Sequence, residues 1–253
     1  MSRRNRGGGG GSSGPAPQRP AVDANHTNVW YMAAGCSPNG TDILPDIGSV
    51  TLSRNSGSGT IATGYSLFSS QQSAYATEAT LTGFTGFGGT LSPTIATNQA
   101  FSLEVIVLFP SESIATVGYL GSVGVFNGLV DYAQILWRES TTLPGFLTLQ
   151  NPAGGYLITG VFGAASDQVL FGVPTHLMLT WQPTGASTGT QTFYINGRLL
   201  ATNTAATAGN RSAAMTAVDV KFIAGSSLAD IRISNIARPQ SYAIAATRAM
   251  RAL

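Results

Sequence analysis

Charge is the scarcest property of this 253-residue chain, in which Asp, Glu, Lys and Arg together make up 9% of the residues, against about 25% in an average soluble protein. Hydrophobic residues still make up 43%, so the chain has enough apolar side chains for a core and too little charge for intrinsic disorder. The single cysteine, Cys36, has no partner for a disulfide within the chain. No run of about 18 apolar residues occurs, so no membrane span is expected.

The few charges are unevenly distributed. Residues 1–20 contain no acidic residue and four basic ones, Arg3, Arg4, Arg6 and Arg19, whereas the rest of the chain carries nine basic and eleven acidic residues. The net charge of +2 is therefore the sum of a basic arm and a slightly acidic body. Glycines follow the first arginines where a signal peptide would have an apolar stretch, so no signal peptide is predicted. The Gly/Ser run and the prolines after it predict a flexible, then extended, arm.

Three interpretations of the arm at 1–20 are open: a solubilising tail, an assembly arm that lies across a neighbouring subunit, and a nucleic-acid-binding arm. Four arginines neutralise few phosphates, so the nucleic-acid interpretation is the least favoured. Turn signals such as Pro38-Asn39-Gly40 predict that residues 21–49 are an irregular linker or docking segment. The residues that could anchor this segment on a neighbour are the apolar Val22, Val29, Trp30 and Tyr31.

Short runs of β-branched and aromatic residues, separated by glycine-containing turns, dominate residues 50–253, which we expect to form one domain. The predicted strands are Ser49–Arg54, Thr60–Phe68, Ala79–Phe84, Phe101–Phe109, Val117–Phe126, Ala133–Arg138, Gly145–Leu149, Tyr156–Phe162, Leu177–Gln182, Thr190–Ile195, Arg198–Thr202, Val218–Ile223 and Leu228–Ile233. Asn196-Gly197 is typical of a tight hairpin turn, and Gln240–Arg251 is the one helical segment expected. The pattern predicts an all-β fold, a two-sheet antiparallel jelly-roll sandwich with a short C-terminal helix and an extended N-terminal arm.

Two segments near the C-terminus carry a family resemblance. The run His176–Trp181 is followed, after a loop, by Thr192-Phe193-Tyr194-Ile195-Asn196-Gly197-Arg198-Leu199, and then by Leu228-Ala229-Asp230-Ile231-Arg232-Ile233-Ser234-Asn235. In order and spacing they resemble the C-terminal half of the laminin-G-like and concanavalin-A-like sandwich superfamily. The alternation Ile231-Arg232-Ile233 also puts both isoleucines on the core face. The resemblance covers residues 170–253 best, 95–169 more weakly, and 1–50 not at all.

The resemblance implies the sandwich fold, which hosts lectins, glucanases, adhesive modules and viral coat parts, so function has to come from sites. Glycoside hydrolysis needs two carboxyl groups about 5–10 Å apart, and the glucanases of this superfamily carry an acidic E-x-D-x-x-E-like strand that is missing here. Glu104 stands alone among apolar residues, and Asp131 and Glu139 are eight positions apart. His26 and His176 lack partners in sequence. We therefore expect no catalytic residues and no enzyme activity.

Neither metal nor cofactor binding is predicted. The chain has no His/Cys cluster at zinc spacing and no dense acidic loop for calcium. Gly86-Phe87-Gly88-Gly89 lacks the lysine and helix of a phosphate loop, and Cys36 is expected to be a small buried residue or an inert thiol. For sugar stacking, Tyr119 and Tyr132 are weak candidates.

Two classes of function are therefore open. The favoured one is a non-enzymatic virion protein, a capsid decoration or surface component of a phage-like virus, made in the host cytoplasm and assembled through its arm with other virion proteins or copies of itself. A surface depleted in charge suits close subunit contact, and the absence of disulfides suits a reducing compartment. The alternative is a glycan-binding laminin-G-like adhesion module. Nucleic acid and membrane partners are not expected.

Overall fold

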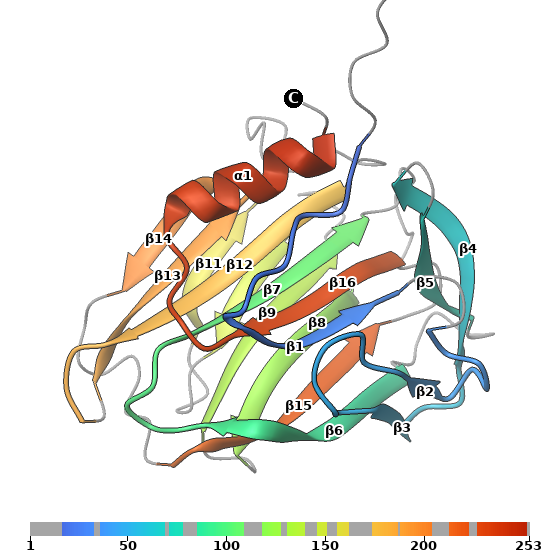
Figure 1. The fold of residues 1–253 in the computed structure, drawn as a ribbon, viewed down its shortest axis with the longest axis horizontal. Helices are drawn as coiled ribbons and strands as arrows, with labels where there is room; N and C mark the ends of the chain where they lie inside the picture. Colours follow the sequence, from blue (N-terminus) through green and yellow to red (C-terminus); the bar gives the residue numbers. More distant parts are fainter. Residues whose placement is uncertain are drawn as a thin grey trace, which may run out of the picture.

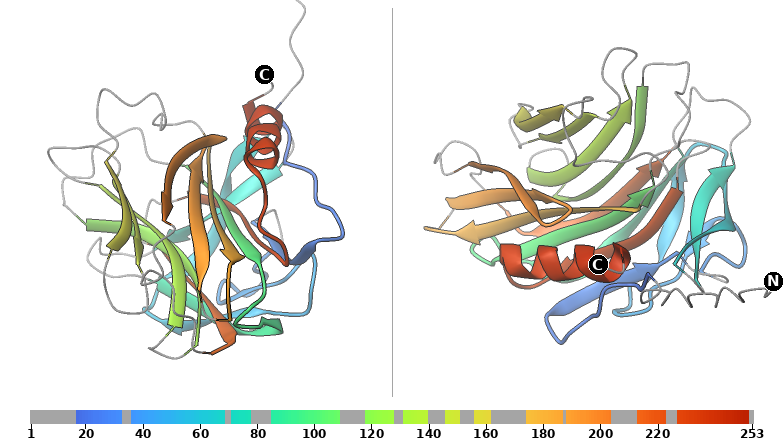
Figure 2. Two further views of the ribbon diagram at one scale, coloured as in Figure 1. Left: turned by 90° about the vertical axis from the view of Figure 1, so that its left-hand side faces the viewer. Right: turned by 90° about the horizontal axis from the view of Figure 1, so that it is seen from above.

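The computed structural model describes residues 17–32, 36–68, 71–77, 85–108, 118–127, 131–139, 146–150, 156–161, 174–186, 188–203, 213–222 and 227–251. Within these residues the fold is mostly β, and its strands form two antiparallel eight-stranded sheets that pack face to face (Figures 1 and 2). The predicted sandwich is therefore confirmed, and its architecture is that of a jelly roll. Residues 1–16 with Arg3, Arg4 and Arg6, and the strand predicted at Ala79–Phe84, lie outside the described residues.

Sheet A has the strand order β14-β13-β12-β7-β16-β5-β4, with β1 paired to β16 off this path. Its strands are β1 (His26–Tyr31), β4 (Thr60–Phe68), β5 (Gln71–Thr77), β7 (Phe101–Leu108), β12 (Pro174–Pro183), β13 (Gly189–Ile195), β14 (Arg198–Asn203) and β16 (Ser227–Ser234). The hairpin between β13 and β14 turns at Asn196 and Gly197, which have positive φ values of 49° and 77°. This matches the backbone conformation that an Asn-Gly turn favours.

Sheet B has the strand order β11-β10-β9-β8-β15-β6-β3-β2. Its strands are β2 (Asp42–Ile43), β3 (Leu52–Ser56), β6 (Thr85–Ile95), β8 (Gly118–Asn127), β9 (Asp131–Glu139), β10 (Phe146–Gln150), β11 (Tyr156–Val161) and β15 (Met215–Phe222). The glycine-rich run Gly86–Gly89, considered above only as a loop, forms the first half of β6. Strand β6 pairs with β15 on one side and with β3 on the other.

The core lies between the two sheets and follows the alternation of the strands. From sheet A it contains Leu103 and Val105 of β7 and the isoleucines of β16, Ile231 and Ile233, each at most 1% exposed. The predicted core position of the two isoleucines is confirmed. Burial of such side chains contributes about 1.5–3 kcal/mol each, so this layer supplies the main stabilisation of the sandwich.

The outer face of sheet A is covered by two segments from opposite ends of the chain (Figure 1). Helix α1 (Gln240–Arg251), predicted with these bounds, lies across β12, β13 and β14. Met250 packs against Ile106 and Ala229 in a second apolar cluster beneath it. Residues 17–25, which we call the strap, run beside α1 toward β1, with the Gln18 amide donating to the Ala249 carbonyl at 2.9 Å. In the described part of the chain no helix has the length and apolar character needed to cross a membrane.

Strand β1 corrects the expectation that residues 21–49 form an irregular linker or docking segment. It pairs antiparallel with β16, Trp30 opposite Ile231, and puts the side chains of Val29 and Trp30 fully inside the protein. The Trp30 indole N–H donates to the carbonyl of Val50 at 2.7 Å. Because these two side chains are buried within this chain, they are not available to anchor it on a neighbouring subunit.

Candidate functional site

The candidate site lies on the face of sheet B that points away from the core. Val218 and Val220 of β15 are fully buried in the core, so the strand alternation directs Asp219 and Lys221 to the opposite face. Their side chains form an ion pair, with 3.0 Å between Lys221 Nζ and Asp219 Oδ2. The Lys221 side chain is 42% exposed and the Asp219 side chain 14%. This pair is the charged centre of the face.

Small residues surround this ion pair. In the register of the sheet, Asp219 lies between Gly88 of β6 and Gly124 of β8. Neighbouring strands are about 4.8 Å apart, and the two residues paired with Asp219 have no side chains of their own. Glycine within a strand often marks a place where a ligand or another chain segment approaches the backbone closely. We call these two glycines, Gly88 and Gly124, the glycine floor on either side of Asp219.

The third polar group of the face, Asn55, reaches over this floor from β3. Its Nδ2 donates to Asp219 Oδ1 at 3.0 Å, and the side chain crosses β6 at Gly86 and Gly88. A Cβ atom at Gly88 would lie 2.5 Å from Asn55 Nδ2, and one at Gly86 would lie 2.7 Å from Asn55 Oδ1. Both glycines are therefore needed for Asn55 to reach Asp219.

Strands β8 and β9 extend the face beyond the floor. Gln134 pairs in register with Gly124 and points away from the core, because its neighbours Ala133 and Ile135 are buried in the core. Phe126, half-buried, lies two positions from Gly124 on the same face. We call Asn55, Phe126, Gln134, Asp219 and Lys221, with the glycine floor, the sheet B polar face. It combines amide, carboxylate and ammonium groups with an aromatic ring.

These groups suit a ligand that offers hydroxyl groups rather than net charge. An amide both donates and accepts, a carboxylate accepts and an ammonium donates, and the charges of Asp219 and Lys221 cancel. In the part of the chain that the structure describes, no three His, Cys, Asp or Glu side chains are grouped so that they could hold a metal ion.

Tyr119 and Tyr132 both lie in the β8–β9 hairpin, but the register separates them. Tyr119 pairs with Arg138 near one end of the hairpin, and Tyr132 pairs with Phe126 near the other. Phe126 follows Tyr119 by seven residues, which corresponds to about 20 Å along a strand. The backbone positions of the two tyrosines therefore lie toward opposite ends of the hairpin. Tyr132 is the one paired with Phe126, and the role of either tyrosine in sugar binding stays a prediction.

The residues predicted for the assembly arm are divided between the body and the undescribed part. Val22 and Tyr31 are half-buried. Arg19, expected in the flexible arm, is bound to the body: its Nη1 is 2.9 Å from Asp230 Oδ1, and its guanidinium lies 4.5 Å from the centre of the Tyr31 ring. Arg19, predicted to belong to the arm at 1–20, is therefore part of the described body.

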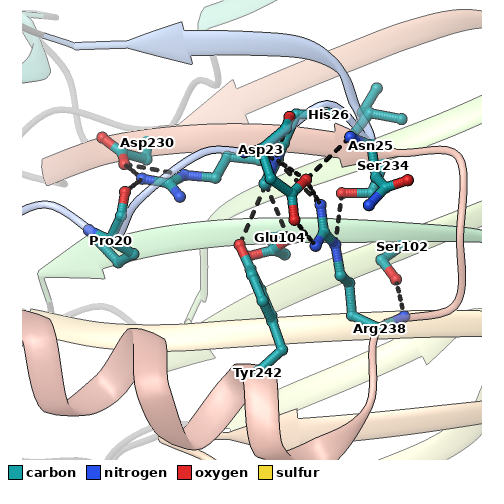
Figure 3. Close-up of polar contacts among 12 residues, drawn as sticks. Pro20, Asp23, Asn25, His26, Ser102, Glu104, Asp230, Ser234, Arg238 and Tyr242 are labelled. Carbon is teal, nitrogen blue, oxygen red and sulfur yellow. Dashed lines mark hydrogen bonds and ion pairs between the residues drawn. The ribbon is translucent and has the colours of Figure 1, made fainter.

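A buried polar cluster lies on the outer face of sheet A, beneath the strap and α1 (Figure 3). Glu104, apparently isolated in sequence, has its Oε2 at 3.1 Å from His176 Nε2 and its Oε1 at 3.8 Å from His26 Nε2. All three side chains are at most 1% exposed. Burial alone would raise the pKa of Glu104, but the hydrogen bond and charge of His176 outweigh it and hold that pKa below its usual value. Because the cluster is sealed from solvent, it suits a structural role.

Two arginine–carboxylate groups fix the strap to this cluster. Arg232 contacts Asp230 Oδ2 at 2.6 Å and donates to the Pro20 carbonyl at 2.8 Å. Burial opposes the charge of Arg232, but Asp230 and Glu104 raise its pKa above the usual value. Arg238 binds both carboxylate oxygens of Asp23 at 2.6 Å, and this bidentate contact holds the pKa of Asp23 well below its usual range.

Sequence reasoning missed both groups of residues, for the same physical reason. Asn55 and Asp219 are 164 positions apart, and His176 is 72 positions from Glu104, so strand pairing alone brings them together. One local signal existed for the sheet B polar face. Gly86 and Gly88 occupy alternate positions beside Phe87, which is the pattern of a strand with one face free of side chains.

Comparison with known proteins found no matching family model and no matching curated protein. Solved structures with the same fold were found. The binding domain of botulinum neurotoxin serotype G matches with a TM-score of 0.58 and 12% identity over 88% of this chain and 50% of that one. The receptor binding domain of the botulinum neurotoxin C/D mosaic serotype matches with a TM-score of 0.57 and 9% identity over 90% and 52%.

A third structure, a Trypanosoma rangeli sialidase in complex with a difluorinated nononic acid sugar, matches with a TM-score of 0.51 and 11% identity over 92% of this chain and 36% of that one. This chain spans about half the length of the two toxin structures and about a third of the sialidase. At these identities the matches show a shared fold, the two-sheet jelly-roll β-sandwich.

Proposed function

We propose that this protein binds a saccharide through the sheet B polar face. The observation that carries the proposal is the position of Asp219, which is flanked in register by Gly88 and Gly124 and held by Asn55 and Lys221. Asn55 covers Gly88, so a sugar ring would lie over Gly124, with its hydroxyl groups against the Asp219 carboxylate and the amides of Asn55 and Gln134. Binding sites of this kind combine a few fixed polar groups with an apolar surface, which Phe126 supplies.

The structural matches support the same class of function. The toxin domains are described as binding or receptor-binding domains, and the sialidase was solved with a sugar-acid ligand. Their fold is shared over 88–92% of this chain. The proposal for this chain is a non-enzymatic recognition module whose ligand is a hydroxyl-rich glycan of a receptor or cell surface.

The test is a glycan array with the full chain, followed by calorimetry on each glycan that binds. We expect Asp219→Asn and Asn55→Ala each to weaken binding about tenfold or more, because a hydrogen bond to a charged group contributes roughly 1.5–3 kcal/mol. Matched controls are Asn235→Ala and Arg248→Gln, since both residues are exposed and lie at the end of β16 and on α1.

Two results would contradict the proposal in different ways. If the wild-type protein binds no glycan on the array at high concentration, saccharide recognition is wrong. If it binds and the Asp219 and Asn55 variants bind equally well, the function is right and the sheet B polar face is the wrong site. The controls test whether substitution of an exposed polar residue elsewhere leaves binding unchanged, and circular dichroism of each site variant checks that it is folded.

Assembly into a virus particle, the function favoured by the sequence, stays a prediction. The structure changes how it should be tested. Arg19 and Pro20 contact Asp230 and Arg232, so deletion of residues 1–20 would damage the body as well as the arm. Deletion of residues 1–16 removes only the part before the strap. A truncated protein that still joins the particle at normal occupancy would contradict the assembly role.

A further inference from the structure

The strap ends at a histidine whose two ring nitrogens have different surroundings. His26 Nδ1 accepts hydrogen bonds from the backbone N–H of Asp23 at 3.0 Å and from Arg238 Nη2 at 3.1 Å. Both of these neighbours are obligatory donors. Nε2 lies 3.1 Å from the Tyr242 hydroxyl and 3.8 Å from Glu104 Oε1 (Figure 3). The arrangement therefore assigns the proton of a neutral ring to Nε2.

A second proton, on Nδ1, would oppose this arrangement. It would point one N–H at two others, from Asp23 and Arg238; its acceptors are the Asp23 carbonyl oxygen at 3.3 Å and, nearer, Asp23 Oδ1 at 3.1 Å. That oxygen already accepts from Arg238 at 2.6 Å and from the Asn25 amide at 2.9 Å. The imidazolium would therefore compete with Arg238 for the Asp23 carboxylate. The bidentate contact between Arg238, which precedes α1, and Asp23 of the strap would then weaken.

Charged groups from every packed element face His26. They are Asp23 in the strap, Glu104 in β7, His176 in β12 through Glu104, Arg232 and Asp230 in β16, Arg238 before α1 and Tyr242 in α1. Burial lowers the pKa of His26, and Arg238 and Arg232 lower it further against the opposing effect of Glu104. The docked strap thus favours the neutral ring.

We propose that His26 is a proton-operated latch, whose protonation below neutral pH releases the strap from the outer face of sheet A. The free ring titrates near pH 6.5, and the docked ring titrates lower. Docking is therefore fully stabilised above about pH 6.5 and loses stability as the pH falls from there toward the docked value. The carboxylates of Asp23 and Glu104, with pKa values below their usual ones, stay ionised over the first part of this window.

Opening of the strap can be distinguished from global unfolding, because β1 stays paired with β16 when the strap opens. Two amides report the difference. The Gln18 N–H bonds to Ala249 across the strap, and the Met32 N–H bonds to Ala229 at 2.8 Å just after β1. Loss of the first without the second means that the strap alone has opened.

The experiment is amide hydrogen exchange by NMR on the full chain between pH 7.5 and 5.0, corrected for the intrinsic pH dependence of exchange. We expect the opening constant at Gln18 to rise by up to tenfold per pH unit below about pH 6.5, with Met32 unchanged. His26→Gln keeps a neutral polar side chain and should remove the pH dependence. His176→Gln, the matched variant of a buried histidine that does not touch the strap, should keep it.

A direct titration of the His26 ring in the wild-type protein keeps the test valid if the variant fails to fold. The ring resonance should titrate over the same pH range in which Gln18 loses protection. The latch is ruled out if Gln18 exchange shows no corrected pH dependence, if the dependence survives in a folded His26→Gln protein, or if the ring titrates outside the window of strap opening.

Discussion

A methyl group added at Gly189 would collide with the indole of Trp181. The Cβ atom would lie 2.3 Å from Cζ2 and 2.5 Å from Cε2 of that ring. Trp181 is 3% exposed and belongs to the core cluster, and close-packed neighbours leave a rigid ring little room to move. Overpacking of this kind costs about 1–3 kcal/mol. We expect Gly189→Ala to lower the free energy of unfolding by about 2 kcal/mol and the Tm by about 4–8 °C.

Gly124→Ala is the matched control for this substitution. Its Cβ atom would have no neighbour closer than 3.4 Å, which is ordinary van der Waals contact. Where the backbone suits alanine, replacing glycine stabilises by about 0.4–1 kcal/mol through the unfolded state. The Gly124→Ala protein should therefore unfold at the wild-type urea midpoint or slightly above it, although it too replaces a glycine by alanine.

Urea unfolding, monitored by tryptophan fluorescence and circular dichroism, gives the midpoint and the free energy of unfolding of both variants. Because Trp181→Phe removes the ring atoms that collide with the added methyl group, the double variant should show a favourable coupling energy of about 1 kcal/mol or more in a double-mutant cycle. A Gly189→Ala protein with the wild-type midpoint, or a cycle with no coupling, would show that the packing at Trp181 is not as described.

Three further predictions concern single residues. Gly197→Ala should destabilise the protein by about 1–3 kcal/mol, because φ there is +77° and the new Cβ would lie 2.8 Å from the backbone of Ile244 in α1; a normal Tm would refute this. Trp30→Phe should cost about 1–3 kcal/mol in urea unfolding, since the buried Val50 carbonyl loses its indole donor, and a change below 0.5 kcal/mol on that same scale would contradict it. Burial raises the pKa of Cys36 to about 11, so a thiol reagent at pH 8 should react only after unfolding; rapid labelling of the native protein would be the contrary result.

The sandwich could be predicted because its signals are local. The alternation around Ile231 and Ile233 and the turn residues Asn196-Gly197 carry the information within a few positions, and the Ala-rich pattern of Gln240–Arg251 does the same for the helix. Each of these elements appears where it was expected. Local propensity, burial and turn chemistry agree in this half of the chain, which is the condition for a pattern to be informative.

Strands β1 and β6 could not be predicted, because their conformation depends on distant partners. His26–Tyr31 has no alternation of its own and becomes a strand by pairing with β16. Gly86 and Gly88 have low strand propensity, yet β6 forms because β15 and β3 pair on either side of it. Arg19 shows the same limit: its sequence neighbours suggest a flexible arm, whereas Asp230, 211 positions later, binds it.

The pairing of β1 with β16 also sets the order of events during synthesis. Trp30 meets Ile231 in the ladder, so β1 cannot pair with its neighbouring strand until β16 has left the ribosome. At about 5–20 residues per second, the roughly 200 intervening residues take some 10–40 s to make. Throughout that interval Trp30 cannot take its place opposite Ile231. The completed sandwich therefore closes only after translation of β16.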